Sequence, residues 1–203
     1  MMLNKPFRFY CLFLLLICGC GKEPGLSRLP ADAVILAFGD SLTHGNGASS
    51  GESYPAVLER LSGRKVVNAG ISGEESAQGL ERLPDLLDQY RPQMLILCHG
   101  GNDILRKRGE AAMEENIRRM IVLAQERKVQ IVLLGVPKPG LFLSSADVYS
   151  RIADSTGVVY IEDIIPDVLG DNALKSDSVH PNGDGYRVIA ETIYEVLQER
   201  GAI

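Results

Sequence analysis

Tryptophan is absent from this chain of 203 residues, and only 6% of its residues are aromatic. A site that holds sugar rings favours aromatic side chains as platforms, so a glycan is a poorly supported ligand. Basic residues are not in excess either, because 21 lysines and arginines face 26 acids and give a net charge of −5. Since nucleic-acid binding needs a basic surface, the composition argues against a nucleic-acid partner.

Cysteine is scarce, and most of it lies near the N-terminus. Cys11, Cys18 and Cys20 fall within the first twenty residues, which leaves only Cys98 in the rest of the chain. A single cysteine permits no disulfide, and its apolar neighbours indicate a small core residue and not a nucleophile. No cluster of cysteines and histidines forms a zinc motif, so we expect neither a metal nor a cofactor.

The N-terminal apolar run is too short to cross a bilayer. Phe9–Ile17 is well below the roughly 20 residues that a membrane helix needs, and it follows Lys5 and Arg8, as in a signal peptide. The run ends in the sequence ICGC, which resembles a bacterial lipobox and implies cleavage before Cys20 and acylation of its thiol. An ordinary secretory signal that is cut nearby is the alternative.

The sequence therefore divides into three parts. We expect residues 1–19 to be a lipoprotein signal peptide, 20–31 a tether with two prolines, and 32–203 a single domain. Cleavage removes two basic residues and no acid, which moves the net charge from −5 to −7. The expected location is the bacterial cell envelope, on the periplasmic face of the outer membrane, with the membrane contacted through lipidated Cys20.

The domain alternates short apolar runs with amphipathic segments. The runs predict strands at Val34–Phe38, Lys65–Asn68, Met94–Cys98, Val129–Leu134 and Val158–Ile161. The amphipathic segments predict helices at Tyr54–Leu61, Ser76–Tyr90, Glu110–Lys128, Ser144–Thr156 and Tyr186–Arg200. This alternation predicts a three-layer α/β/α sandwich with a five-stranded parallel sheet, flavodoxin-like in its strand order 2-1-3-4-5. Pro84 predicts a kink or break in its helix, and residues 164–178 are expected to be irregular.

Several loops of small and polar residues follow these strands. Gly39–Ser41 places a serine at the carboxyl end of a buried strand, which is where ligands bind in open α/β sheets. Asn68–Gly73 and Gly100–Asp103 follow the second and third strands, and Asp177–Pro181 precedes the last helix. Together they supply a hydroxyl nucleophile, free N–H groups, an amide side chain and an acid–base pair, which are the components of acyl transfer.

These loops also carry a family resemblance. GDSL at Gly39–Leu42, Gly70 within NAGISG, GGND at Gly100–Asp103 and DSVH at Asp177–His180 resemble, in order, the four blocks of the SGNH/GDSL hydrolases. The stretch Val66–Arg106 is especially similar to the bacterial thioesterase I/lysophospholipase L1 branch, which includes arylesterases. The resemblance covers nearly the whole predicted domain.

The resemblance implies a role for each matching residue. Ser41 resembles the nucleophile, His180 the base that accepts its proton, and Asp177 the acid that orients the imidazole. The oxyanion hole would consist of the Ser41 N–H, the Gly70 N–H and the side-chain amide of Asn102.

Simpler interpretations of the same residues stay open. Ser41 is also a suitable helix N-cap, Gly70 and Asn102 are suitable turn residues, and Asp177 is a suitable surface cap.

Other residues compete for the triad roles. His99 closes a buried strand and is expected to pack there, whereas His44 lies near the serine in sequence and is expected to line the pocket. Asp184 is a second acid near the C-terminal helix, and Asp40 is expected to brace its loop. Leu141–Leu143 is interpreted as core or as a contact to an acyl chain.

The resemblance implies that the protein hydrolyses small-molecule carboxylic esters and thioesters, acyl or aryl, including lysophospholipids, through an acyl-enzyme. We expect a monomer. An O-acetyl esterase that acts on envelope polysaccharide would use the same fold and triad. A nucleotide-binding module is a further alternative, but Gly45 and Gly47 lead to Ser50, where that motif requires a third glycine. A catalytically silent lipoprotein is disfavoured by the complete set of triad residues.

Overall fold

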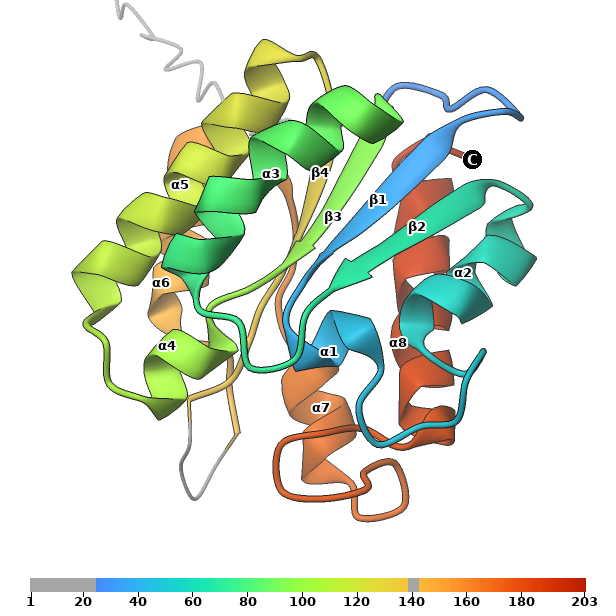
Figure 1. Cartoon of the computed structure of the whole chain (residues 1–203). Helices are drawn as coiled ribbons and strands as arrows, with labels where there is room; N and C mark the ends of the chain where they lie inside the picture. Colours follow the sequence, from blue (N-terminus) through green and yellow to red (C-terminus); the bar gives the residue numbers. More distant parts are fainter. Residues whose placement is uncertain (1–24, 139–142) are drawn as a thin grey trace, which may run out of the picture.

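The computed structural model describes residues 25–138 and 143–203 of the chain (Figure 1). The predicted signal peptide, Cys20 and the first part of the predicted tether lie outside the described residues, as do Leu141 and Phe142. The last part of the predicted tether packs onto the domain. Leu29 is 2% exposed, because burying its apolar side chain is lower in free energy than leaving it in water as part of a free linker. Its N–H donates to the Ala202 carbonyl at 2.8 Å.

A five-stranded parallel sheet forms the centre of the domain. Its strands are β1 (Val34–Gly39), β2 (Lys65–Gly70), β3 (Met94–Cys98), β4 (Gln130–Leu134) and β5 (Val159–Ile161). Their order is β2-β1-β3-β4-β5, which confirms the predicted arrangement. Gly39 pairs with Gly70 on one side and with Cys98 on the other. The carboxyl ends of β2, β1 and β3 are therefore level, and the three loops that follow them start side by side.

Helices cover both faces of the sheet, as predicted for three layers (Figure 1). One face carries α3 (Ser76–Tyr90), α5 (Glu110–Glu126) and α6 (Asp147–Thr156), and the other carries α2 (Tyr54–Ser62) and α8 (Gly183–Glu199). Three short helices, α1 (Ser41–His44), α4 (Gly101–Leu105) and α7 (Ile164–Gly170), lie at the carboxyl ends of the strands. None of the helices in the described part of the chain is long and apolar enough to span a membrane.

The core lies on both sides of β1 and β3. Residues Ile35–Phe38 and Met94–Cys98 are fully buried, because helices pack on both faces of these two central strands. Cys98 is a free, buried thiol within β3.

Three local expectations are wrong in whole or in part. Pro84 does not break helix α3, which continues through it, and the buried Leu83 and Leu87 hold the helix against the sheet. Residues 164–170 form helix α7, in which Pro166 occupies the first turn and its missing N–H costs no helical bond. Strand β2 extends to Gly70, so the loop after it begins later than expected.

The two ends of the described chain meet at the amino ends of the strands. The Leu26 N–H donates to the Arg200 carbonyl at 3.2 Å, and the side chain of Gln130, at the start of β4, bonds with the main chain of Ser27. This end of the molecule is opposite the loops that follow β1, β2 and β3 (Figure 1).

Candidate active site

The turn after β1 places Ser41 at the first position of helix α1. Gly39 is required for this turn, since a Cβ at residue 39 would lie 2.0 Å from the Cys98 carbonyl oxygen. Asp40 is buried, and its Oδ1 accepts a hydrogen bond from the Leu42 N–H at 3.1 Å. Burial raises the pKa of Asp40 despite the opposing influence of His99. The carboxyl group therefore braces the turn, as expected from the sequence.

Ser41, His180 and Asp177 form a continuous chain of hydrogen bonds. The Ser41 Oγ lies 3.0 Å from His180 Nε2, and His180 Nδ1 lies 2.8 Å from Asp177 Oδ2. Since an aspartate can only accept at Nδ1, this nitrogen carries the proton and Nε2 is free to accept from the serine. The structure thus brings together all three residues that the resemblance singles out.

Asp177 is tied to its own loop as well as to the histidine. Its Oδ1 accepts hydrogen bonds from the N–H groups of Val179 at 2.8 Å and His180 at 2.9 Å. Burial raises the pKa of Asp177, but the hydrogen bonds from the His180 ring and the two N–H groups outweigh it and lower the pKa. The Asp177 side chain is 52% exposed and that of His180 is 21% exposed, so the carboxylate faces water on one side.

The proposed oxyanion role of Gly70 is wrong. Its N–H donates to the Asn68 Oδ1 at 3.0 Å, and the residue belongs to β2 and not to the following loop. A Cβ at residue 70 would lie 2.1 Å from the His44 nitrogen. Glycine at this position therefore lets helix α1 pack against β2.

Gly73, three residues later, lies at the cavity where Gly70 was expected to offer its N–H. It lines the same cavity as Ser41, Asn102 and His180. Neither its N–H nor that of Ser41 has a hydrogen-bond partner among the described residues. Gly73 adopts a φ of +79°, which favours glycine. The sequence NAGISG contains both glycines, and its composition alone does not distinguish them.

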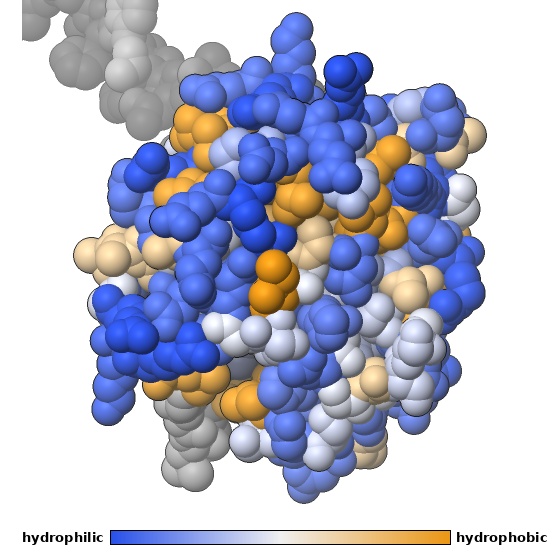
Figure 2. Space-filling model, viewed as in Figure 1, coloured by the Kyte–Doolittle hydropathy of each residue, from blue (hydrophilic) through white to orange (hydrophobic). Residues whose placement is uncertain are grey.

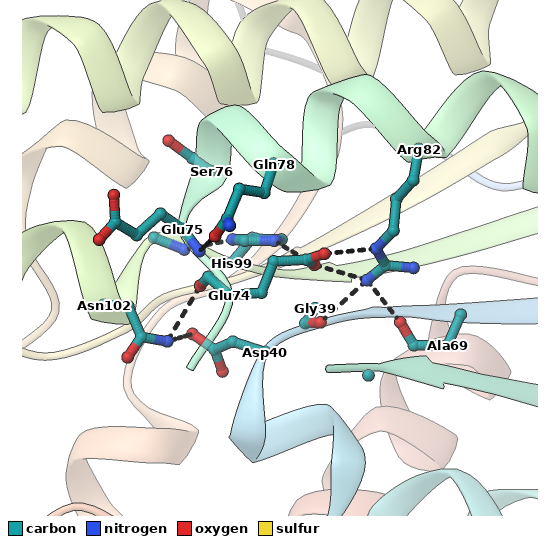
Figure 3. A network of polar contacts seen from close by, with 12 residues as sticks. Gly39, Asp40, Ala69, Glu74, Glu75, Ser76, Gln78, Arg82, His99 and Asn102 are labelled. Carbon is teal, nitrogen blue, oxygen red and sulfur yellow. Dashed lines mark hydrogen bonds and ion pairs between the residues drawn. The ribbon is translucent and has the colours of Figure 1, made fainter. Parts of the chain in front are cut away.

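Asn102 lines the same cavity, and its amide nitrogen points toward the Glu74 main chain and the Asp40 carboxyl group (Figure 3). Its Nδ2 donates to the Glu74 carbonyl at 3.0 Å and makes a long contact of 3.4 Å to the Asp40 Oδ2. The first bond fixes the amide, whereas the second is longer than the usual range and leaves one proton available to a ligand.

A cavity of about 550 Å³ opens at these groups. Most of its wall is apolar and is contributed by Leu42, Leu105, Val136, Leu143, Leu169 and Val179. Figure 2 shows hydrophobic side chains on either side of a hollow toward the lower edge of the molecule. Of the apolar group Leu141–Leu143, only Leu143 is described, and it lines this cavity.

The competing residues are occupied elsewhere. His99 is fully buried, and its Nε2 lies 3.1 Å from the Glu74 Oε2. His44 places its Nδ1 3.3 Å from the Gly70 carbonyl and lines a polar groove on the other side of His180, which Asp177 also lines. Asp184 accepts a hydrogen bond from Arg187 at 2.7 Å. Within residues 25–138 and 143–203, no group of three histidine, cysteine or acidic side chains is placed to hold a metal ion.

Comparison with known proteins identifies the family. Residues 37–188 match the GDSL-like Lipase/Acylhydrolase family. The chain is 30% identical to "Thioesterase 1/protease 1/lysophospholipase L1" of Escherichia coli K12, over 96% of this chain and 95% of that protein. It is 29% identical to an arylesterase of Vibrio mimicus, over 82% and 89% of the two chains. The crystal structure of the psychrotrophic esterase EstA from Pseudoalteromonas sp., inhibited by monoethylphosphonate, has a TM-score of 0.74 and 26% identity, and covers 83% of this chain and 98% of that one. The chain therefore belongs to the GDSL-like lipase/acylhydrolase family and is an ester hydrolase of the SGNH type.

Proposed function

We propose that the protein is a serine esterase that transfers an aliphatic acyl group to Ser41 and then to water. The main support is the hydrogen-bonded chain from Ser41 through His180 to Asp177, which ends in a mostly apolar cavity.

In the first half-reaction, Ser41 Oγ attacks the ester carbonyl carbon while its proton passes to His180 Nε2. Asp177 keeps Nδ1 protonated and stabilises the resulting imidazolium. When the tetrahedral intermediate collapses, the bond to the leaving oxygen breaks, and that oxygen takes the proton from Nε2 to leave as an alcohol. The acyl group stays on Ser41.

The second half-reaction uses the same groups in the same order. A water molecule attacks the acyl carbon and gives its proton to His180 Nε2. The second tetrahedral intermediate expels Ser41 Oγ, which takes that proton back, and the product is a carboxylic acid. No group outside the chain is needed to balance the protons.

Negative charge develops on the carbonyl oxygen in both steps. We assign its stabilisation to the N–H groups of Ser41 and Gly73 and to the Asn102 amide, with Gly73 in place of Gly70. Both N–H groups lack other partners among the described residues, so they are free to bind the oxyanion without losing a hydrogen bond.

The cavity favours an acyl chain of several carbons. An acetyl group would contact little of its apolar wall, which speaks against an O-acetyl esterase as the main activity. Oxygen esters, thioesters and lysophospholipids can all present the same acyl chain to this wall, and they differ only in the leaving group. The names of the relatives, thioesterase, lysophospholipase and arylesterase, cover these three groups of substrate.

A substrate series tests this proposal. Purified protein is assayed with p-nitrophenyl esters of increasing acyl length, an acyl-thioester and a lysophospholipid, alongside Ser41→Ala. We expect kcat/KM to rise beyond the acetyl ester and the variant to lose several orders of magnitude. An alkylphosphonate ester should add one phosphonyl group to the wild type and none to the variant, as measured by intact mass. Near-normal turnover by the variant would remove Ser41 from the mechanism.

We further propose that the esterase is a monomer held in the bacterial envelope through lipidated Cys20. The support is the lipobox-like sequence that ends at this cysteine after a short apolar run.

A further inference from the structure

We propose that Glu74, held by Arg82 and His99, is a positioning residue for the oxyanion hole. The inference rests on the proposed function, because it concerns how the donors for that reaction are held in place. Glu74 itself lines no part of the cavity and touches no reacting atom.

The main chain of Glu74 lies between two of the three donors. Gly73, whose N–H faces the cavity, directly precedes it, and the Glu74 carbonyl accepts the hydrogen bond that fixes the Asn102 amide. Within the described part of the chain, the only other main-chain bond of Glu74 is a turn contact of 3.2 Å from its N–H to the Ile71 carbonyl. The backbone alone therefore holds this turn weakly.

The side chain of Glu74 supplies the missing restraint. It turns inward, so that the residue is only 6% exposed. Its two oxygens lie 2.6 Å from the Arg82 Nε and Nη2, and Oε2 also lies 3.1 Å from His99 Nε2 (Figure 3). Burial raises the pKa of Glu74, but the hydrogen bonds from His99 and Arg82 outweigh it and hold the pKa below its usual value. A buried, charged and bidentate contact of this kind is strong and strictly oriented.

Arg82 connects this carboxylate to the ends of two strands. Its Nη2 also donates to the Ala69 carbonyl at 2.8 Å and to the Gly39 carbonyl at 3.3 Å (Figure 3). The guanidinium lies 4.1 Å from the centre of the Phe38 ring. Gly39 is two residues before Ser41, so one planar group ties the turn of the nucleophile to the turn of Gly73. Lysine has no such planar fork.

His99 is held in one orientation and one tautomer. The Gly100 N–H donates to its Nδ1 at 3.0 Å, so the ring proton is on Nε2 and is donated to Glu74. Helix α3 passes so close that a Cβ at Gly79 would lie 2.4 Å from Nε2. His99 and Gly100 connect β3 to helix α4, which carries Asn102. The network thus joins the three segments that carry the donors.

The test compares Glu74→Gln with Glu114→Gln, a matched control. Glu114 also binds two arginines, Arg118 and Arg151, but it lies on α5 away from the site. Steady-state constants are measured with a p-nitrophenyl ester, together with the inhibition constant of an alkylboronic acid, whose adduct with Ser41 places a negative oxygen in the hole. Thermal melts check that each variant is folded.

Loss of an oxyanion donor lowers kcat by about 10²–10³-fold. We therefore expect Glu74→Gln to lower kcat by about 10-fold or more, with KM changed by less than about 3-fold and boronate affinity reduced in parallel with kcat. Glu74→Asp should recover part of the loss, and Glu114→Gln should leave all three constants unchanged.

A folded Glu74→Gln variant with kcat and boronate affinity within about 3-fold of wild type would overturn the inference. If this variant does not fold, His99→Leu decides in the same way, because it removes one bond to the carboxylate and keeps both arginine contacts. A Ser41→Ala variant that stays active would instead refute the proposed function. Failure of the inference on Glu74 can therefore be told apart from failure of the proposed function.

Discussion

Replacing Asp177 by asparagine should harm the enzyme more than replacing it by serine, although asparagine is the closer match in shape. Asp177 uses one oxygen for the N–H groups of Val179 and His180 and the other for His180 Nδ1. Asparagine has only one oxygen. The two backbone N–H groups together outcompete the single N–H of His180 Nδ1 for this oxygen. The asparagine oxygen therefore stays with the backbone, and its amide nitrogen faces Nδ1.

This arrangement forces the wrong histidine tautomer. An N–H group opposite Nδ1 requires that nitrogen to be unprotonated, which moves the ring proton to Nε2. His180 then has no lone pair to accept the Ser41 proton. The same change of tautomer in a serine protease costs about 10⁴ in kcat. We expect about 10³–10⁴ for Asp177→Asn, which corresponds to about 4–5.5 kcal/mol in the barrier.

Serine at residue 177 avoids this problem. Its hydroxyl can accept a hydrogen bond from the Val179 N–H in a local turn. Water on the exposed side of the site can accept a hydrogen bond from the protonated Nδ1. What is lost is the attraction between carboxylate and imidazolium, which amounts to about 1 kcal/mol in water and about 4 kcal/mol near a protein surface at 4 Å. Because the Asp177 side chain is 52% exposed, the lower part of this range applies, about 1–2 kcal/mol or 5- to 30-fold.

The assay is kcat with a p-nitrophenyl ester at neutral pH, with thermal melts to show that both variants keep the loop folded. An asparagine variant that is as active as the serine variant, or more active, would show that the tautomer argument is wrong.

Four further predictions follow from the same structure. Asn102→Ala should lower kcat by about 10²–10³-fold and change KM little; the opposite pattern would take its amide out of the oxyanion hole. Gly70→Ala should lower the melting temperature, because the added Cβ meets the His44 backbone at 2.1 Å; an unchanged melt would contradict this packing role. The Glu74 carboxylate, whose pKa is lower in the folded state, should stabilise the fold above its ordinary pKa of 4.5 and lose that effect as the pH falls through its lower folded value; Glu74→Gln should make the melting temperature fall less steeply on acidification below that ordinary pKa, and an unaltered slope would argue against it. Cys20→Ser should release the protein from membranes into the soluble fraction, and persistent membrane association would exclude the lipid anchor.

The sequence was most informative where residues are buried on all sides or gathered in short motifs. The apolar runs at β1 and β3 predicted central strands because both faces of a parallel sheet are covered. Ser41, Asp177 and His180 could be grouped because each lies in a compact motif whose position in the fold follows from the strand order.

Other features depend on contacts that no local pattern carries. Whether a glycine offers its N–H or merely makes room is decided by its neighbours, so Gly70 and Gly73 are indistinguishable before Asn68 and His44 are in place. The environment of Glu74 is hidden for the same reason, since its partners lie 8 and 25 residues away along the chain. The helicity of residues 164–170 comes from burial against the domain and not from propensity.

The position of the chain ends has a consequence for how the enzyme would work beside a surface. Residues 25–29 leave the domain at the amino ends of the strands, while helix α1, which begins at Ser41, lies at the opposite pole (Figure 1). An attachment point upstream of residue 25 would orient the entrance outward, away from the surface that holds it. Such an enzyme would meet esters that diffuse past it more readily than lipids still embedded in the leaflet beneath.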